Sequence, residues 1–200
     1  AGTGLDVTDT LVVKFVAAAA VKVGLSAQSL QGTVDAPLPI VLRALDQFDN
    51  VNLDESRKVV VDAVGDVSGG AGTDRVSGDG EATFAQGTAT MSISSKNAQD
   101  VQVGLSDGNG LNVDATLTLK FKAGAAAKIT MAAPQSAVVE AGASVTLQAV
   151  DQYDNNALGD FSVKLLATTP ATVSNSGVAQ LVNGQASMQV NCLEAKQINL

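Results

Sequence analysis

The sequence of 200 residues contains no histidine, no tryptophan, one cysteine and one tyrosine. Without histidine there is no imidazole for acid–base catalysis or for metal ligation. Cys192 is the single cysteine, so a disulfide within the chain is excluded. With Tyr153 as the one tyrosine, the chain lacks the aromatic platforms that bind sugars, which argues against a glycosidase and against an aromatic-rich carbohydrate-binding module. We expect no catalytic residue.

Long hydrophobic runs and basic patches are absent as well. No apolar stretch reaches the ~18 residues of a membrane helix, and Ala17–Ala20 is only a short alanine run, so we expect no membrane insertion. The net charge of −8 argues against a phosphate-binding surface for nucleic acid and fits an extracellular or cation-binding protein. Because the sequence begins at Ala1 rather than methionine, we expect a processed N-terminus without a remaining signal peptide.

The residues that are abundant favour strands. Hydrophobic residues make up 46% of the chain but aromatic residues only 3%, so any core must be built from Val, Leu, Ile, Ala and Met. Valine and threonine, which fit the pleated surface of a sheet, are spread along the whole length. The composition therefore predicts an all-β fold.

A tandem repeat organises the chain. The segment Gly4–Phe15 recurs 106 positions later as Gly110–Phe121, and the gapless match continues to Lys22 and Lys128. A repeat of this length corresponds to one small sandwich domain. Each copy of the strand runs through a short alanine-rich joint into the next strand. A joint of about four residues is too short for free tumbling, so we expect stiff coupling of neighbouring domains.

The repeat is out of phase with the chain. We predict that residues 1–16 form the last strand of a preceding or partner sandwich. Residues 17–124 then form one domain, and residues 125–200 form a second domain that lacks its last strand. A sandwich without that strand exposes unpaired backbone groups and core side chains.

Alternating hydrophobic residues define the strands within each copy. The strand that contains Ile40 and Leu42 matches the strand that contains Val145 and Leu147, and these side chains are expected to face inward. Asn183-Gly184 between two alternating runs predicts a hairpin. With turns every 8–12 residues, the pattern predicts tandem immunoglobulin-like β-sandwiches of about seven strands each.

Two sequence motifs carry a family resemblance. The segment Val150–Leu158, with the sequence VDQYDNNAL, resembles the signature that follows the second strand in bacterial immunoglobulin-like repeats of the invasin/intimin type. Gly87–Met91 and Gly184–Met188 resemble the later hairpin strand of those repeats. At Asp49 and Asp154 the chain departs from the family, which usually has glycine there. The resemblance covers residues 17–200 and implies a stalk or spacer displayed on the bacterial cell surface, without catalytic residues.

Two acidic loops are candidate calcium sites. Calcium takes six to eight oxygen ligands from carboxylates, amides and carbonyls, and each loop offers several such side chains within about ten residues. The alternative is that Asp46 and Asp151 only cap a turn through nearby backbone N–H groups while the other side chains are solvated. Calcium is the one cofactor that we consider. The candidate ligands are Asp46, Asp49, Asn50, Asn52 and Asp54 in the first loop and Asp151, Asp154, Asn155, Asn156 and Asp160 in the second.

Cys192 stands where the first copy has Ser95, on or just after a strand. A single cysteine is usually a small buried hydrophobic residue. In an exported protein it can instead pair with a cysteine of another subunit or of a segment beyond Leu200. Nucleophilic catalysis lacks its base because the chain has no histidine.

Three functions remain open from the sequence. The first is a structural stalk, spacer or adhesin segment whose partners are neighbouring repeats or a host surface ligand. The second is a self-assembling filament or surface-layer subunit, in which residues 5–15 complete the second domain of an identical subunit head to tail, with Leu11, Val13 and Phe15 as the inserted side chains. The third is a ligand-binding module that uses the divergent loop Gly65–Gly80.

Overall fold

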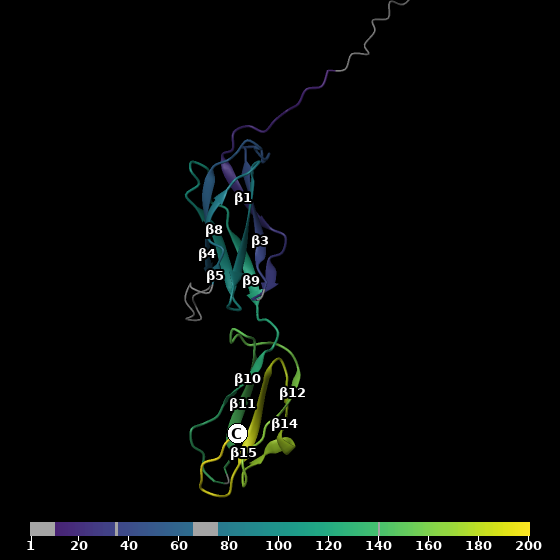
Figure 1. The fold of residues 1–200 in the computed structure, drawn as a ribbon, viewed down its shortest axis with the longest axis vertical. Coiled ribbons are helices and arrows are strands. Elements are labelled where there is room, and N and C mark those ends of the chain that lie inside the picture. The colour runs from purple at the N-terminus through teal and green to yellow at the C-terminus, as the bar shows by residue number, and fades with distance from the viewer. Residues whose placement is uncertain (1–10, 35, 66–75, 140) are drawn as a thin grey trace, which may run out of the picture.

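The computed structural model describes residues 11–34, 36–65, 76–139 and 141–200. It confirms the all-β prediction: two β-sandwiches lie end to end along the longest axis of the molecule (Figure 1). Residues 11–16 form no strand in the described structure, and they run away from the first sandwich with their side chains exposed. Nowhere in the described ranges is there a helix with the length and hydrophobicity needed to cross a bilayer.

The first domain is a complete two-sheet sandwich. One sheet has the strand order β1-β3-β7-β5 and the other has the order β2-β9-β8-β4-β6. The first order corresponds to A-B-E-D of an immunoglobulin constant-type domain, and β9-β8-β4 corresponds to G-F-C. The strands are β1 (Lys22–Ala27), β2 (Gln31–Thr33), β3 (Leu38–Leu45), β4 (Lys58–Gly65), β5 (Val76–Ser77), β6 (Gly80–Thr83), β7 (Thr88–Ser95), β8 (Asp100–Ser106) and β9 (Leu117–Lys122).

The core of the first domain follows the predicted alternation. Ile40, Leu42 and Ala44 on β3 are completely buried, as are Leu119 on β9 and Val103 on β8. Burying an aliphatic side chain of this size is worth about 1.5–3 kcal/mol. The alternating face of each strand therefore supplies the free energy that joins the two sheets.

The second domain keeps one sheet and part of the other. The order β10-β11-β15-β13 repeats that of the first domain, but among the described residues only β12 and β14 stand where the first domain has five strands. A 3₁₀ turn covers Ser174–Gly177. The strands are β10 (Lys128–Ala132), β11 (Ala143–Val150), β12 (Phe161–Lys164), β13 (Thr172–Val173), β14 (Val178–Leu181) and β15 (Gln185–Asn191).

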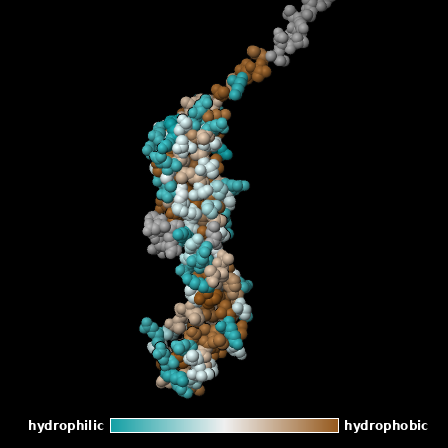
Figure 2. Space-filling model, in the orientation of Figure 1, coloured by the Kyte–Doolittle hydropathy of each residue, from teal (hydrophilic) through white to brown (hydrophobic). Residues whose placement is uncertain are grey.

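The core of the second domain is correspondingly open. Val145, Leu147 and Val190 are buried, but the described residues of this domain include no counterpart of the buried Leu119 and Phe121 of β9. In one view of the surface, hydrophobic side chains gather on the second domain and on the N-terminal segment, while the first domain presents a more polar face (Figure 2).

Some predicted boundaries differ from the structure. The repeated segment Gly110–Phe121 is a strand only in its second half, because β9 begins at Leu117. The reason is that Asn112 turns the chain through a hydrogen bond to the backbone N–H of Asp114. The described residues of the first domain form nine strands rather than about seven, because β2 and β5 are short segments held by one neighbour each. Of the predicted ligand-binding loop Gly65–Gly80, residues 66–75 lie outside the described residues.

Candidate functional site

The loop that follows β11 lies at the joint between the domains, and Asp151 organises it. Its carboxylate is buried, and Oδ1 accepts hydrogen bonds from the backbone N–H groups of Tyr153 at 2.8 Å and Asn155 at 3.0 Å. Oδ2 accepts a bond of 2.9 Å from the backbone N–H of Gly124, in the linker between β9 and β10. One side chain therefore shapes the loop and holds the incoming chain. We call residues 151–155 the joint loop.

Asn155 connects the joint loop to the first domain. Its side-chain Nδ2 donates to the backbone carbonyl of Lys96 at 2.8 Å, and its Oδ1 accepts from the backbone N–H of Ala98 at 2.9 Å. The same Nδ2 donates to both oxygens of Asp151, at 3.1 and 2.9 Å, which fixes the orientation of the amide. The ring of Tyr153 packs against the hydrophobic core of the first domain.

The contacted residues belong to the turn between β7 and β8. Ser95 is buried and holds this turn: its Oγ donates to the carbonyl of Asn97 at 2.8 Å and accepts from the side chain of Gln99 at 3.0 Å. The equivalent turn at the far end of the second domain repeats the first of these bonds, because Cys192 Sγ donates to the carbonyl of Glu194 at 3.3 Å. Cys192 thus has the structural position of Ser95 and is half-buried.

The first domain carries a second loop of the same kind, which we call the upper loop, residues 46–50. Asp46 is buried and accepts bonds from the backbone N–H groups of Phe48 and Asn50, both at 2.9 Å. Its Oδ2 accepts from the N–H of Ala18 at 3.0 Å, the counterpart of Gly124. Asn52 adds a bond of 2.7 Å to the carbonyl of Ala18.

Each loop also holds the lysine that begins the first strand of its own domain. Lys22 pairs with Asp49 at 2.7 Å, and Lys128 pairs with Asp154 at 2.6 Å. Asp49 and Asp154 adopt left-handed backbone angles, with φ of 68° and 69°, a conformation that glycine adopts most readily. In this chain aspartate tolerates the angle and adds an exposed ion pair.

The buried carboxylates are held in their charged form. Burial raises the pKa of Asp46, but the hydrogen bonds from Asn50, Ala18 and Phe48 outweigh it, so the pKa lies below its usual value. Burial likewise raises the pKa of Asp151, but the hydrogen bonds from Asn155, Gly124 and Tyr153 outweigh it, so this pKa also lies below its usual value. Both loops therefore keep their geometry at neutral pH.

The ion pair between Arg57 and Glu55 was not predicted from the sequence. Arg57 donates from Nε and Nη2 to Glu55 at 2.9 and 2.6 Å, and the side chain of Arg57 lowers the pKa of Glu55 to about 2. The same guanidinium bonds the carbonyls of Ala20 at 3.1 Å and Asn109 at 3.2 Å. It thereby ties the incoming chain to the turn before β9.

The candidate calcium ligands divide into separate roles in the structure. Asp46 and Asp151 accept bonds from backbone and Asn N–H groups, which a calcium ion would have to displace. Asp54 is exposed beside Asn52, and Asp160 accepts the N–H of Asn183 at 3.2 Å. Within the described ranges, no three Asp, Glu or Cys side chains converge in a metal-binding group. Calcium binding at these loops stays a prediction.

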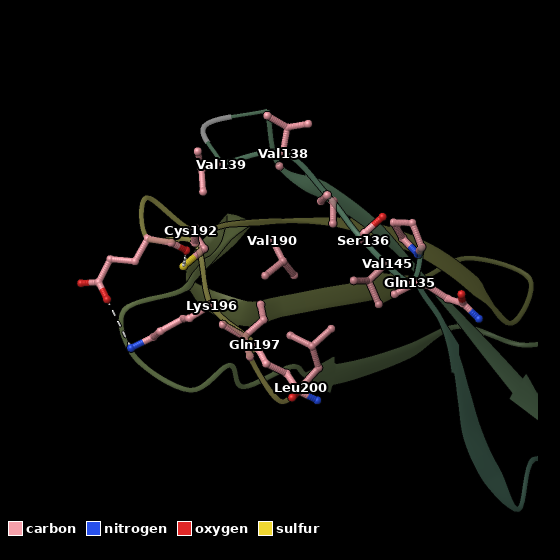
Figure 3. Close-up of a pocket in the computed structure, with 18 residues that line it drawn as sticks. Gln135, Ser136, Val138, Val139, Val145, Val190, Cys192, Lys196, Gln197 and Leu200 are labelled. Carbon is pink, nitrogen blue, oxygen red and sulfur yellow. Dashed lines mark hydrogen bonds and ion pairs between the residues drawn. The ribbon is translucent and has the colours of Figure 1, made fainter.

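A cavity of about 630 Å³ opens at the far end of the second domain. Val145 and Val190 of its core line the cavity, together with Val138, Val139 and Leu200 (Figure 3). With the offset that matches β3 to β11, Val138 and Val139 are the counterparts of Thr33 and Val34, which in the first domain lie on β2 or at its end and pair with β9. The cavity therefore lies where the second domain lacks strands.

Comparison with known proteins finds no matching family model and no matching curated protein. Among solved structures, the chain is similar to FdeC, an Escherichia coli adhesin, with 16% sequence identity and a TM-score of 0.43 over 86% of this chain and 56% of that one. It is also similar to domains 4–9 of the surface-layer protein SbsC, with 11% identity and a TM-score of 0.29 over 87% of this chain and 27% of that one. The chain spans little more than half of the first of these and about a quarter of the second.

Proposed function

We propose that the chain is a non-catalytic stalk or spacer segment of an adhesin or another extracellular bacterial surface protein. Its task is mechanical: to hold successive immunoglobulin-like domains in a fixed line. The observation that carries this proposal is the pair of bonds from Asn155 to the backbone of Lys96 and Ala98 across the joint.

Several contacts restrain the same joint. Domain interfaces in one chain are mobile by default unless they are held together. Here the linker is pinned at Gly124 by Asp151 and again at Ala127, whose N–H donates to the carbonyl of Val150 at 2.8 Å. The ring of Tyr153 also packs against the core of the first domain, so both the linker and the joint loop restrain the joint. A linker of so few residues, anchored twice, favours a stiff connection.

The location outside the cell is supported by sequence. The motifs of residues 87–91 and 150–158 resemble repeats of exported bacterial proteins, and the net charge of −8 suits an exposed soluble surface.

The proposal is tested by comparing two double variants of the full chain. Tyr153→Ala with Asn155→Ala removes the contacts across the joint. Phe48→Ala with Asn50→Ala is the matched control, since Asn50 makes the same bonds to Asp46 that Asn155 makes to Asp151. Nuclear magnetic resonance relaxation gives the rotational correlation time of each domain separately.

Coupled domains share one long correlation time. We expect this for the wild type and the control, and a shorter, separate value for each domain in the Tyr153/Asn155 variant. If both variants behave like the wild type, the joint contacts are not what couples the domains. If the wild-type domains already tumble separately, the stalk proposal is wrong.

A second candidate is assembly by strand donation from residues 5–15. It is favoured by the exposure of Leu11 and Phe15, which are 89% and 90% exposed, whereas Phe121, the counterpart of Phe15, is 2% exposed. The cavity of the second domain offers a place for such side chains.

The sheet order of the first domain limits this candidate. There β9 pairs with β8 and β2, and it reaches β4 only through β8. A donated copy of β9 would therefore leave an empty position beside β12 unless a counterpart of β8 is supplied as well. The joint between the domains needs no additional strand, so the stalk is the function that the geometry supports best.

A further inference from the structure

The upper loop of the first domain repeats the surface with which the second domain contacts the first. Phe48 and Asn50 stand where the joint loop has Tyr153 and Asn155. Asp46 shapes the upper loop with the same hydrogen bonds that Asp151 makes. The difference is in exposure, because Phe48 is 71% exposed while the ring of Tyr153 packs on a neighbouring core.

The chain reaches both loops along the same path. The N–H of Ala18 bonds to Asp46 as that of Gly124 bonds to Asp151. Val21 then donates to the carbonyl of Leu45 at 2.8 Å, as Ala127 does to Val150. At the joint between the two domains, this path follows β9, the last strand of the first domain. At the upper loop the same path follows the copy of β9 in the sequence, residues 11–16.

We propose that the upper loop is a docking surface for a covalently preceding repeat of the same fold, whose last strand includes residues 11–15, the counterparts of residues 117–121 on β9. Phe48 packs against the core of that repeat, as Tyr153 packs against the core of the first domain. Asn50 bonds the backbone of the turn that corresponds to the turn between β7 and β8. This inference rests on the proposed stalk function and extends it to the joint above the first domain.

The chemistry of the lower joint shows why such a contact can recur. Across the joint Asn155 bonds backbone atoms of Lys96 and Ala98, so recognition depends on the shape of the turn rather than on its side chains. The turn at Cys192, at the far end of the second domain, keeps its shape-determining bond to Glu194 although its sequence differs. The backbone shape that the joint loop contacts is thus present in the corresponding turn of both domains.

The exposed aromatic ring provides the test, because the chain contains no tryptophan. Phe48→Trp introduces a single fluorescent reporter in the upper loop, and Tyr153→Trp introduces the reference reporter in the joint loop. Each variant is made in the 200-residue chain and in an extended chain with a copy of residues 17–109 placed directly before Gly4. Gly4 is the counterpart of Gly110, so this fusion continues the repeat without a gap.

Quenching by acrylamide measures how accessible each tryptophan is. We expect strong quenching of the Phe48→Trp reporter in the 200-residue chain. In the extended chain we expect it to fall to the level of the Tyr153→Trp reporter, which stays the same in both chains. Calorimetry reports whether the added repeat folds, through an additional unfolding transition.

Three results would overturn the proposal. Unchanged quenching of the Phe48→Trp reporter beside a folded added repeat shows that the loop does not dock. An added repeat that does not fold shows that residues 11–15 are not part of its last strand. Protection that rises with protein concentration in the 200-residue chain shows that the occupant is a second copy. Failure of the stalk function is read separately, from independent tumbling at the lower joint.

Discussion

Replacing Asp151 by asparagine tests the role of one oxygen at the joint. The asparagine retains one acceptor oxygen and turns the other position into an amide donor. With its oxygen at the Oδ1 position it still accepts the backbone N–H groups of Tyr153 and Asn155. Its NH₂ group then faces the N–H of Gly124 and the Nδ2 of Asn155, and of these two donors only Nδ2 keeps a bond to the Oδ1 position. In the reverse orientation the NH₂ group faces the backbone N–H groups of Tyr153 and Asn155, so two backbone hydrogen bonds are lost instead of one. The substitution therefore breaks the bond that pins the linker.

The expected loss follows from the kind of bond that is removed. A hydrogen bond to a charged acceptor contributes about 1.5–3 kcal/mol, and an unpaired donor now remains in its place. We expect Asp151→Asn to lower the free energy of unfolding of the second domain by that amount. The assay is urea denaturation followed by the amide signals of each domain, which resolves the two domains separately.

Asp46→Asn is the matched control. It breaks the equivalent bond to Ala18, so it should destabilise the first domain while the contacts of Asn155 stay intact. Because the pKa of Asp151 is lowered, its contribution is present above about pH 4 and is lost as the pH falls through the folded value. The difference between wild type and Asp151→Asn should shrink accordingly in acid. A loss below about 0.5 kcal/mol at neutral pH would refute the assigned role of Oδ2.

Four further predictions follow from the same contacts. Glu55 has a pKa of about 2, lowered by the bond from Arg57, so the first domain should lose stability as the pH falls from about 4.5 to 2, and Glu55→Gln should remove that dependence in acid denaturation. Gly184→Ala places a methyl group against the carbonyl of Ala157 at a φ of 78°, so thermal unfolding should show a loss of about 1–3 kcal/mol in the second domain. Deleting residues 1–16 should leave the assembly state unchanged in light scattering, whereas strand donation requires that polymers disappear. If the acidic loops bind calcium, the unfolding temperature rises with calcium concentration; an unchanged temperature would count against the calcium hypothesis.

Local pattern was sufficient to predict most of the fold. The alternation around Ile40 and Val145 places the same residues inward in the structure, and both become fully buried. The turn at Asn183-Gly184 forms as expected, with both residues at positive φ. The short strands β2 and β5 carry no alternating pattern of their own, since pairing with β9 and β7 creates them.

The joint was only partly accessible to sequence reasoning. The acidic residues around Asp151 suit both a calcium site and a turn, because the composition does not reveal which donors face the carboxylate. The partners of Asn155 are backbone atoms of Lys96 and Ala98, which leave no trace in the identity of those residues. The exposure difference between Phe48 and Tyr153 appears only when the neighbouring domain is in place.

Whether the two domains form one rigid body is measured most directly by residual dipolar couplings of the wild-type chain. Each domain reports its own alignment in a weakly ordered medium. A stiff stalk predicts that the couplings of residues 17–122 and those of residues 128–191 fit one and the same alignment tensor. Two tensors of clearly different magnitude would show that the domains move independently, and would contradict a stiff stalk.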